Sequence, residues 1–93
     1  MISEQTKREL FVKDNIVRLA ETEFPDNKGI QWNILGFEHN AHLTYVEVEP
    51  IPATVGYPRL KFVVSFKNPE MPRIIGIMCF KDGQYSMLSK KKK

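Results

Sequence analysis

The sequence predicts an α+β domain in which one N-terminal helix packs on a five-stranded antiparallel meander sheet. Residues 3–24 form an amphipathic helical pattern that no glycine or proline interrupts. Residues 30–88 consist of short runs of alternating apolar and polar side chains, separated by turn residues. The length of 93 residues suits one small core, so residues 1–88 are predicted to form a single domain.

The predicted helix begins at Ser3, a residue type that caps helix N-termini, and Glu4 places negative charge in the first turn. A helical wheel gathers the apolar side chains on one side and leaves Phe11 on the other. The apolar side consists of Leu10, Val12, Ile16, Val17, Leu19, Ala20 and Phe24. Residues 25–29 contain Pro25 and Gly29 and are predicted to end the helix and turn the chain.

Five strands are predicted, at residues 30–38, 42–49, 59–67, 73–81 and 84–88. The clearest turn is Asp82-Gly83, because a two-residue hairpin turn of type I′ needs positive φ at both central positions. Centring the connection between the second and third strands on Thr54 places two glutamates opposite two basic residues, which favours that register. The two pairs are Glu47 with Lys61 and Glu49 with Arg59.

These registers divide the apolar side chains between the two faces of the sheet. Trp32 is expected opposite Val48, and Phe62 opposite Met78. The aromatic-rich face is expected to lie under the helix, and a close helix approach there would explain its two glycines, Gly36 and Gly76. Its apolar members are Ile30, Trp32, Ile34, Val46, Val48, Leu60, Phe62, Val64, Phe66, Ile74, Met78, Phe80, Tyr85 and Met87.

The opposite face is predicted to be a contact surface. A single helix covers one face, and monomers seldom expose a contiguous apolar patch larger than a few hundred Å². The predicted interface residues are Leu35, Phe37, Leu43, Tyr45, Val63, Ile75, Ile77 and Leu88. Three occupants remain open: the chain's own 50–58 loop or C-terminal segment, a second copy in a homodimer, or a different protein, peptide or apolar ligand.

The layout resembles cystatin-type folds, in which such a sheet cradles one helix. The resemblance is topological. The cystatin signature, a Gln-x-Val-x-Gly hairpin, belongs in the loop that here reads Glu38-His39-Asn40-Ala41-His42. The nearest similar segment, Ala53-Thr54-Val55-Gly56, lies one loop later and lacks the glutamine. The resemblance therefore implies a fold and no protease inhibition.

No catalytic, metal or cofactor site is predicted. Cys79 is the only thiol, and neither histidine is expected within hydrogen-bond reach of it, so we interpret it as a packed or interfacial cysteine. His39 and His42 lie across a predicted turn beside Glu38, but zinc needs further ligands that the lone cysteine cannot supply from its place in the sheet.

The net charge of +3 comes from residues 90–93, four lysines that we interpret as a disordered basic tail, residues 89–93. Without them, ten basic residues face eleven acidic ones. Five further cations could suggest a nucleic-acid platform, but the glutamates opposite Arg59 and Lys61 argue against it. Those five are Arg59, Lys61, Lys67, Arg73 and Lys81. Lys67 and Arg73 are expected to lie opposite each other at one sheet edge, without an acidic partner, where they could hold an anion.

A cytoplasmic location is expected, because one cysteine allows no internal disulfide and the N-terminus lacks the apolar core of a signal peptide. No apolar run approaches the roughly 20 residues that span a membrane. The leading hypothesis is a small non-enzymatic interaction module, a homodimer through the helix-free sheet face. The alternatives are an inhibitor or immunity-type protein that blocks a protein partner, and a weak nucleic-acid-binding protein.

Overall fold

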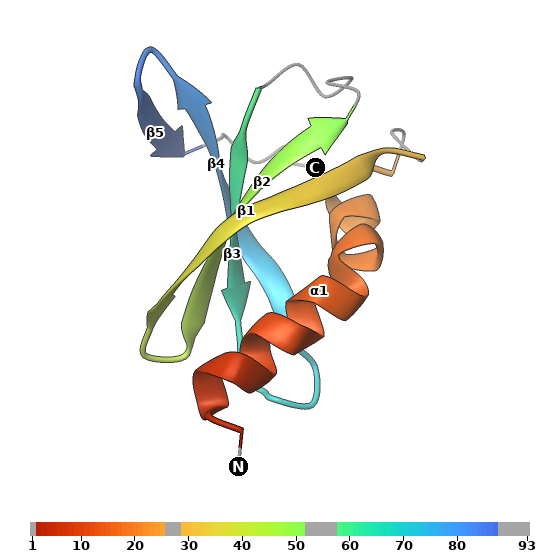
Figure 1. Ribbon diagram of the computed structural model, residues 1–93, viewed down its shortest axis with the longest axis vertical. Coiled ribbons are helices and arrows are strands. Elements are labelled where there is room, and N and C mark those ends of the chain that lie inside the picture. Colours follow the sequence, from red (N-terminus) through yellow and green to blue (C-terminus); the bar gives the residue numbers. More distant parts are fainter. Residues whose placement is uncertain (1, 26–28, 52–57, 88–93) are drawn as a thin grey trace.

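The computed structural model describes residues 2–25, 29–51 and 58–87. These residues form one helix and one antiparallel sheet whose strands follow chain order, so the predicted α+β meander is confirmed (Figure 1). The elements are α1 (Glu4–Glu23), β1 (Gln31–Asn40), β2 (Leu43–Ile51), β3 (Leu60–Ser65), β4 (Arg73–Lys81) and β5 (Gln84–Met87). The predicted domain end at residue 88 and the predicted tail, residues 89–93, lie outside the described residues.

The helix begins as predicted. Ser3 Oγ accepts a hydrogen bond of 3.1 Å from the Thr6 backbone N–H, which satisfies one of the free donors of the first turn. Its buried stripe consists of Val12, Ile16, Leu19 and Ala20.

The predicted apolar side of the helix was partly wrong. Leu10 and Val17 are exposed, whereas Phe11 turns inward and packs edge-on against Phe66, with ring centroids 5.8 Å apart. The helix is rotated toward Phe11 because this aromatic pair buries a large apolar area on the far side of the stripe. Leu10 and Val17 are thereby left at the surface.

The middle of the sheet follows the predicted register. Val46 lies opposite Phe62, Val48 opposite Leu60, and Glu47 opposite Lys61. All four of the apolar residues are fully buried beneath α1. The Asp82-Gly83 turn also forms as predicted, with φ of 54° and 81°.

β1 departs from the predicted register for two reasons: its hairpin with β2 closes at the pair Asn40–Leu43, and it contains a β-bulge. Trp32 lies opposite Pro50 and not Val48, and Leu35 is an extra residue between the pairs that Ile34 and Gly36 make with β2. The alternation of faces shifts by one residue beyond that point. Phe37 therefore lies opposite Val46 and packs against the helix-covered core, so its predicted place on the helix-free face was wrong.

β4 contains a second β-bulge with the same effect. Ile75 is the extra residue, and Phe62 lies opposite Ile77 instead of Met78. Ile77 and Cys79 therefore join the core under α1, which corrects their predicted place on the helix-free face. Four residues that were predicted to lie in the core move to the other face instead. They are Met78, Phe80, Tyr85 and Met87.

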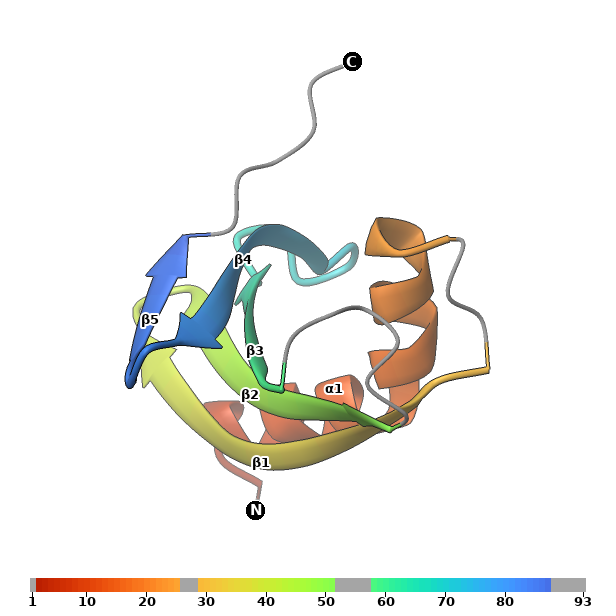
Figure 2. The same ribbon diagram turned by 90° about the horizontal axis from the view of Figure 1, so that it is seen from above.

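The sheet is curved, and α1 lies against one of its faces, with β5 at the far side of the molecule (Figure 2). The two glycines that follow the extra residues are not on the helix side. Gly36 lies opposite the charged Glu47, and Gly76 lies opposite Val63. The prediction that a close helix approach requires them was therefore wrong, and they follow bulges instead.

The bulge in β4 predicts that replacing Ile75 or Ile77 with alanine lowers the free energy of unfolding by very different amounts. Ile77 is 3% exposed and Ile75 is 49% exposed. We expect Ile77→Ala to lower the free energy of unfolding by about 2–5 kcal/mol, because it leaves a cavity in the core. Ile75→Ala is expected to change it by less than about 1 kcal/mol. Urea unfolding of both variants measures this, and equal losses, or a larger loss at Ile75, would contradict the bulge.

Candidate binding surfaces

The predicted interface residues do not form one apolar patch. Phe37 packs, partly buried, against the core and Ile77 lies within it, so neither lies on the helix-free face. Leu88 lies outside the described residues. Leu35 and Ile75, the two extra residues of the bulges, are exposed, and Leu43 and Tyr45 are half-buried. The interface itself stays a prediction, with a smaller set of residues to carry it.

Val63 is covered although no helix lies over it. It stands between Tyr45 and Gly76 in the sheet and is 6% exposed. A Cβ at Gly76 would lie 3.3 Å from Met87 Cε and 3.7 Å from Val63 Cγ2. The missing side chain at Gly76 thus makes room for Met87 to lie beside Val63 on the helix-free face. This narrows the apolar surface that the sequence predicts there.

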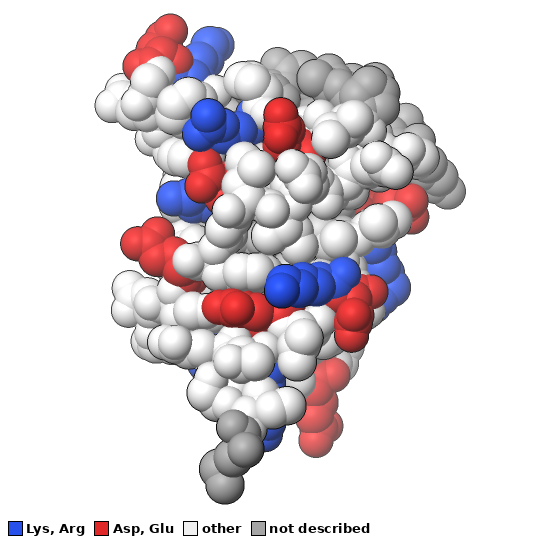
Figure 3. Space-filling view, viewed as in Figure 1, with Lys and Arg blue, Asp and Glu red and all other residues white. Residues whose placement is uncertain are grey.

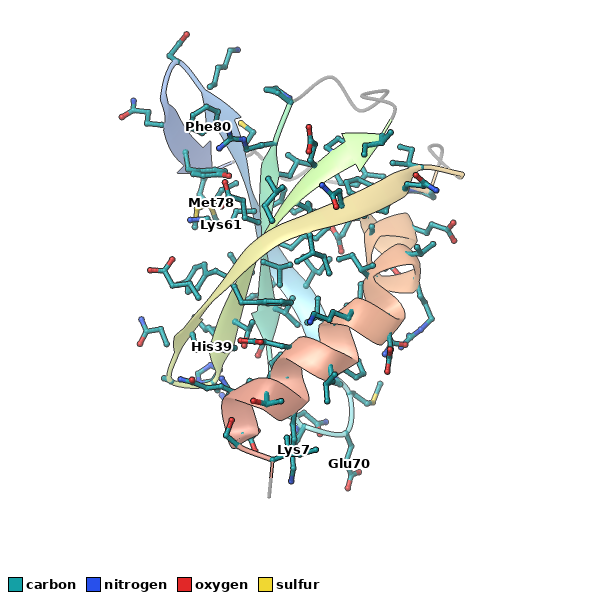
Figure 4. All side chains as sticks on the ribbon, in the orientation of Figure 1. Lys7, His39, Lys61, Glu70, Met78 and Phe80 are labelled. Atoms are coloured by element: carbon teal, nitrogen blue, oxygen red, sulfur yellow. The ribbon has the colours of Figure 1, made fainter. Side chains whose placement is uncertain are left out.

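A cluster of charged and aromatic side chains occupies the part of the helix-free face next to β5. We call it the Glu47 cluster, and it consists of Glu47, Arg59, Lys61, Phe80 and Tyr85. Tyr85 Oη donates a 2.6 Å hydrogen bond to Glu47 Oε2, and Arg59 Nη1 donates one of 3.3 Å to the same oxygen. Figure 4 shows Lys61 and Phe80 at this end of the sheet.

The two aromatic rings of the Glu47 cluster, Phe80 and Tyr85, also contact its two cations, Arg59 and Lys61. Lys61 Nζ lies 4.5 Å from the centre of the Tyr85 ring, and the Arg59 guanidinium carbon lies 4.9 Å from that of Phe80. Lys61 Nζ is also 3.9 Å from Glu38 Oε1. The predicted pairing of Arg59 with Glu49 is replaced by one with Glu47. The cations that suggested a nucleic-acid platform here are therefore engaged by carboxylates and rings.

The hydrogen bond within the Glu47 cluster changes the acidity of both partners. Donation by the Tyr85 hydroxyl lowers the pKa of Glu47 from its usual 4.5, and Arg59 acts in the same direction against the effect of burial. Burial, together with the bond to the Glu47 carboxylate, raises the pKa of Tyr85 from 10.0 to about 12. The sequence does not reveal this pair, because only the bulge in β4 brings Phe80 and Tyr85 to the face of Glu47.

His39 lies under the helix and not at an exposed turn. Its Nε2 is 2.8 Å from Glu9 Oε2 of α1, its Nδ1 is 3.1 Å from Thr44 Oγ1, and its ring stacks on that of Phe37 (Figure 4). Thr44 is fully buried. His39 thus ties the β1–β2 hairpin to the first half of α1, and both of its nitrogens are engaged.

Other candidate chemistry is not assembled. Cys79 is buried, and its Sγ lies 4.0 Å from Ser86 Oγ. Within residues 2–25, 29–51 and 58–87, no three His, Cys, Asp or Glu side chains are grouped so as to hold a metal ion. The described part of the chain contains no helix with the length and apolarity required to cross a membrane.

A groove with basic walls lies between α1 and the connection from β3 to β4. Its main cavity, of roughly 610 Å³, is lined by three cations and one acid among its charged residues: Arg18, Lys67, Arg73 and Glu70. Exposed Met71 and Ile75 and half-buried Phe11 supply its apolar surface. Arg73 lies opposite Ser65 and not Lys67, but both cations line the groove, which brings them to one site.

The groove continues along the second half of α1. An adjoining cavity of roughly 540 Å³ shares Arg18, Pro72, Arg73 and Ile75 with the main one and extends to Thr22 and Glu23. Arg18 Nη2 donates to Asn15 Oδ1 at 2.8 Å, and no described acidic side chain forms an ion pair with Lys67 or Arg73. The result is an elongated groove with an excess of positive charge in its main cavity.

Comparisons with protein-family models, with curated proteins and with solved structures gave no match to this chain.

Removing the Tyr85 hydroxyl tests the Glu47 cluster at acid pH. We expect Tyr85→Phe to raise the pKa of Glu47 toward 4.5 and to cost about 1 kcal/mol of stability at neutral pH. A carboxyl whose pKa is lowered by folding stabilises the fold above its unfolded-state pKa, and this stabilisation is lost as pH falls through the folded-state pKa. The stability difference between wild type and variant should therefore shrink below pH 4.5. A difference that stays constant with pH would contradict the pairing.

An absorbance titration of the tyrosines tests the same bond at alkaline pH. The chain contains three tyrosines, and we expect the phenolate of Tyr85 to form only near pH 12, because burial and the Glu47 carboxylate oppose its charge. The neutral phenol stabilises the fold fully below pH 10, and this effect is lost as pH rises toward 12. Tyr85→Phe should remove the late step from the titration, whereas a late step that persists would show that another tyrosine produces it.

Proposed function

We propose that the protein is a small non-enzymatic interaction module that self-associates, and that two copies meet along the outer edge of β1. The observation that carries this proposal is the unpaired edge itself. β1 stands at the end of the sheet, and within the described residues its backbone hydrogen-bonds to another strand only on the β2 side. An edge strand presents free N–H and C=O groups that a second strand can pair with.

The composition of β1 supports this use of its edge. Natural edge strands are commonly protected by charged residues and proline, but Gln31–Asn40 contains no proline and one formal charge, Glu38. Figure 3 shows an uncharged area on the face on which β1 lies, above a row of basic and acidic side chains. The bulge at Leu35 interrupts the ladder, so a pairing would use the straight segments on either side of it.

Apolar side chains lie beside the first of these segments. Val17 of α1 and Ile51 of β2 are 47% and 45% exposed, and they flank Trp32 around a cavity of roughly 350 Å³. A second copy in antiparallel orientation would bring the same residues of both copies together about a two-fold axis, which closes the assembly as a dimer. The apolar flanks then supply the burial that main-chain pairing alone lacks.

Two further features support a binding role without catalysis. Cys79, the only thiol, is packed in the core, and His39 is held between Glu9 and Thr44. A reducing, cytoplasmic setting fits the single buried thiol. The predicted face-to-face dimer through the helix-free surface is a competing arrangement, and it relies on Tyr45.

Sedimentation equilibrium over a concentration series tests the dimer. We expect wild type to dimerise and the double variant Val17→Lys with Ile51→Lys to be monomeric, because four lysines would meet at the two-fold axis. Both positions are exposed, so the fold should be retained, as circular dichroism can check.

Tyr45→Lys is the matched control on the helix-free face. It should leave the dimer unchanged if β1 is the contact, and it should dissociate the dimer if the sheet faces meet. A wild-type protein that stays monomeric at every concentration would sink self-association altogether.

A further inference from the structure

We infer that the groove between α1 and β4 binds an extended acidic segment of a partner protein, which adds as a strand to the outer edge of β4. Two independent features converge there: a stretch of strand edge to which no described residue pairs, and a concentration of cations that form no ion pair with a described acidic residue. This inference does not depend on the proposed dimer, which uses the opposite edge of the sheet.

Among the described residues, none pairs with the outer edge of β4 over its first half. β5 is four residues long and pairs with residues 78–81 of β4. Within the described residues, residues 73–77 hydrogen-bond on the β3 side, and no backbone bond reaches their other edge. Five residues of strand offer about 16 Å of main-chain donors and acceptors, which is enough to hold a short extended peptide by strand addition.

The charges around this edge select an acidic occupant. Arg73 belongs to the edge itself, Arg18 faces it from α1, and Lys67 lies across the main cavity. Glu70 is the one acid of that cavity, and Glu23 lies in the adjoining one. An arginine matches a carboxylate with two parallel hydrogen bonds, so Arg18 and Arg73 can fix the register of alternate acidic side chains.

The apolar residues of the groove indicate a peptide with alternating character. Met71 and Ile75 are exposed beside the cations, and Phe11 is half-buried behind them. An extended segment presents successive side chains to opposite sides, so acidic residues can meet the cations while apolar ones cover Ile75. A second copy of this chain fits poorly here, because antiparallel pairing of β4 with β4 would bring two cationic grooves side by side, each lined by Arg18, Lys67 and Arg73.

Nucleic acid fits the groove less well than an acidic peptide. Single-stranded nucleic acid is commonly held by aromatic rings that lie free for stacking, in addition to cations. The one aromatic ring of the main cavity belongs to Phe11, and its ring already packs on Phe66. A phosphate backbone would also meet Glu70.

Fluorescence anisotropy with a labelled peptide of alternating Glu and Val residues tests the site in the full chain. We expect saturable binding that weakens as salt is raised, and a loss of about tenfold or more in affinity for Arg73→Glu. Lys13→Glu is the matched control, because it makes the same charge change at an exposed position of α1 outside the groove. Equal losses for the two variants, or no saturable binding, would overturn the proposal.

Two backbone-methylated versions of the peptide separate strand addition from charge attraction. They carry methyl groups on alternate sets of amide nitrogens, so each keeps every side chain and loses half of the N–H donors. Only the set that faces β4 should abolish binding, because the other set points away from the edge. If both versions bind like the parent, strand addition is wrong. If a single-stranded oligonucleotide of equal charge binds more tightly, an acidic protein segment is not the ligand.

Discussion

Two extra residues in the ladders of the sheet determine which side chains lie under the helix. Leu35 and Ile75 are each an extra residue in their strand, without a partner in the neighbouring strand. Each one reverses the face of the sheet on which the following residues lie. Phe37 and His39 thereby come under α1, where His39 meets Glu9. Ile77 and Cys79 enter the core by the same reversal in β4. The packing of both halves of the helix depends on these two positions.

The reversal in β4 also makes the helix-free face less apolar than the sequence suggests. Met78 and Phe80 lie on the helix-free face in place of Ile77 and Cys79. Tyr85 and Met87 of β5, their partners in the sheet, lie on the same face. Tyr85 and Phe80 give Glu47, Arg59 and Lys61 partners at close range, so polar groups on this face are satisfied within the chain. The surface that the sequence suggests as apolar is in large part a network of charges and rings. Among the described residues, backbone groups without a strand partner remain at the outer edge of β1 and at residues 73–77 of β4.

The sequence predicts those parts of the fold that local patterns determine. The capped helix, the Asp82-Gly83 turn and the register of β2 with β3 each follow from residues close in sequence or from pairs of opposite charge. The two bulges could not be predicted from the alternation of apolar and polar residues, because the inserted residue is of an ordinary strand type. A weak signal does exist, since Gly36 and Gly76 each follow an extra residue, and a glycine inside a strand often marks a bulge. The groove could not be predicted in full, because Arg18 joins Lys67 and Arg73 only through the packing of α1.

The two sheet edges that no described residue pairs with differ in charge, and we propose that this difference separates their partners. Each edge contains a bulge, which limits any added ladder to a short segment, so main-chain pairing needs support from side chains. Beside β1 that support is apolar and uncharged, from Val17, Trp32 and Ile51, which suits an identical edge related by two-fold symmetry. Beside β4 it is cationic, from Arg18 and Arg73, so like edges repel and an acidic strand is preferred. In the arrangement that we propose, self-association and partner binding use separate edges of one sheet, and the positive charge beside β4 disfavours its pairing with its own copy.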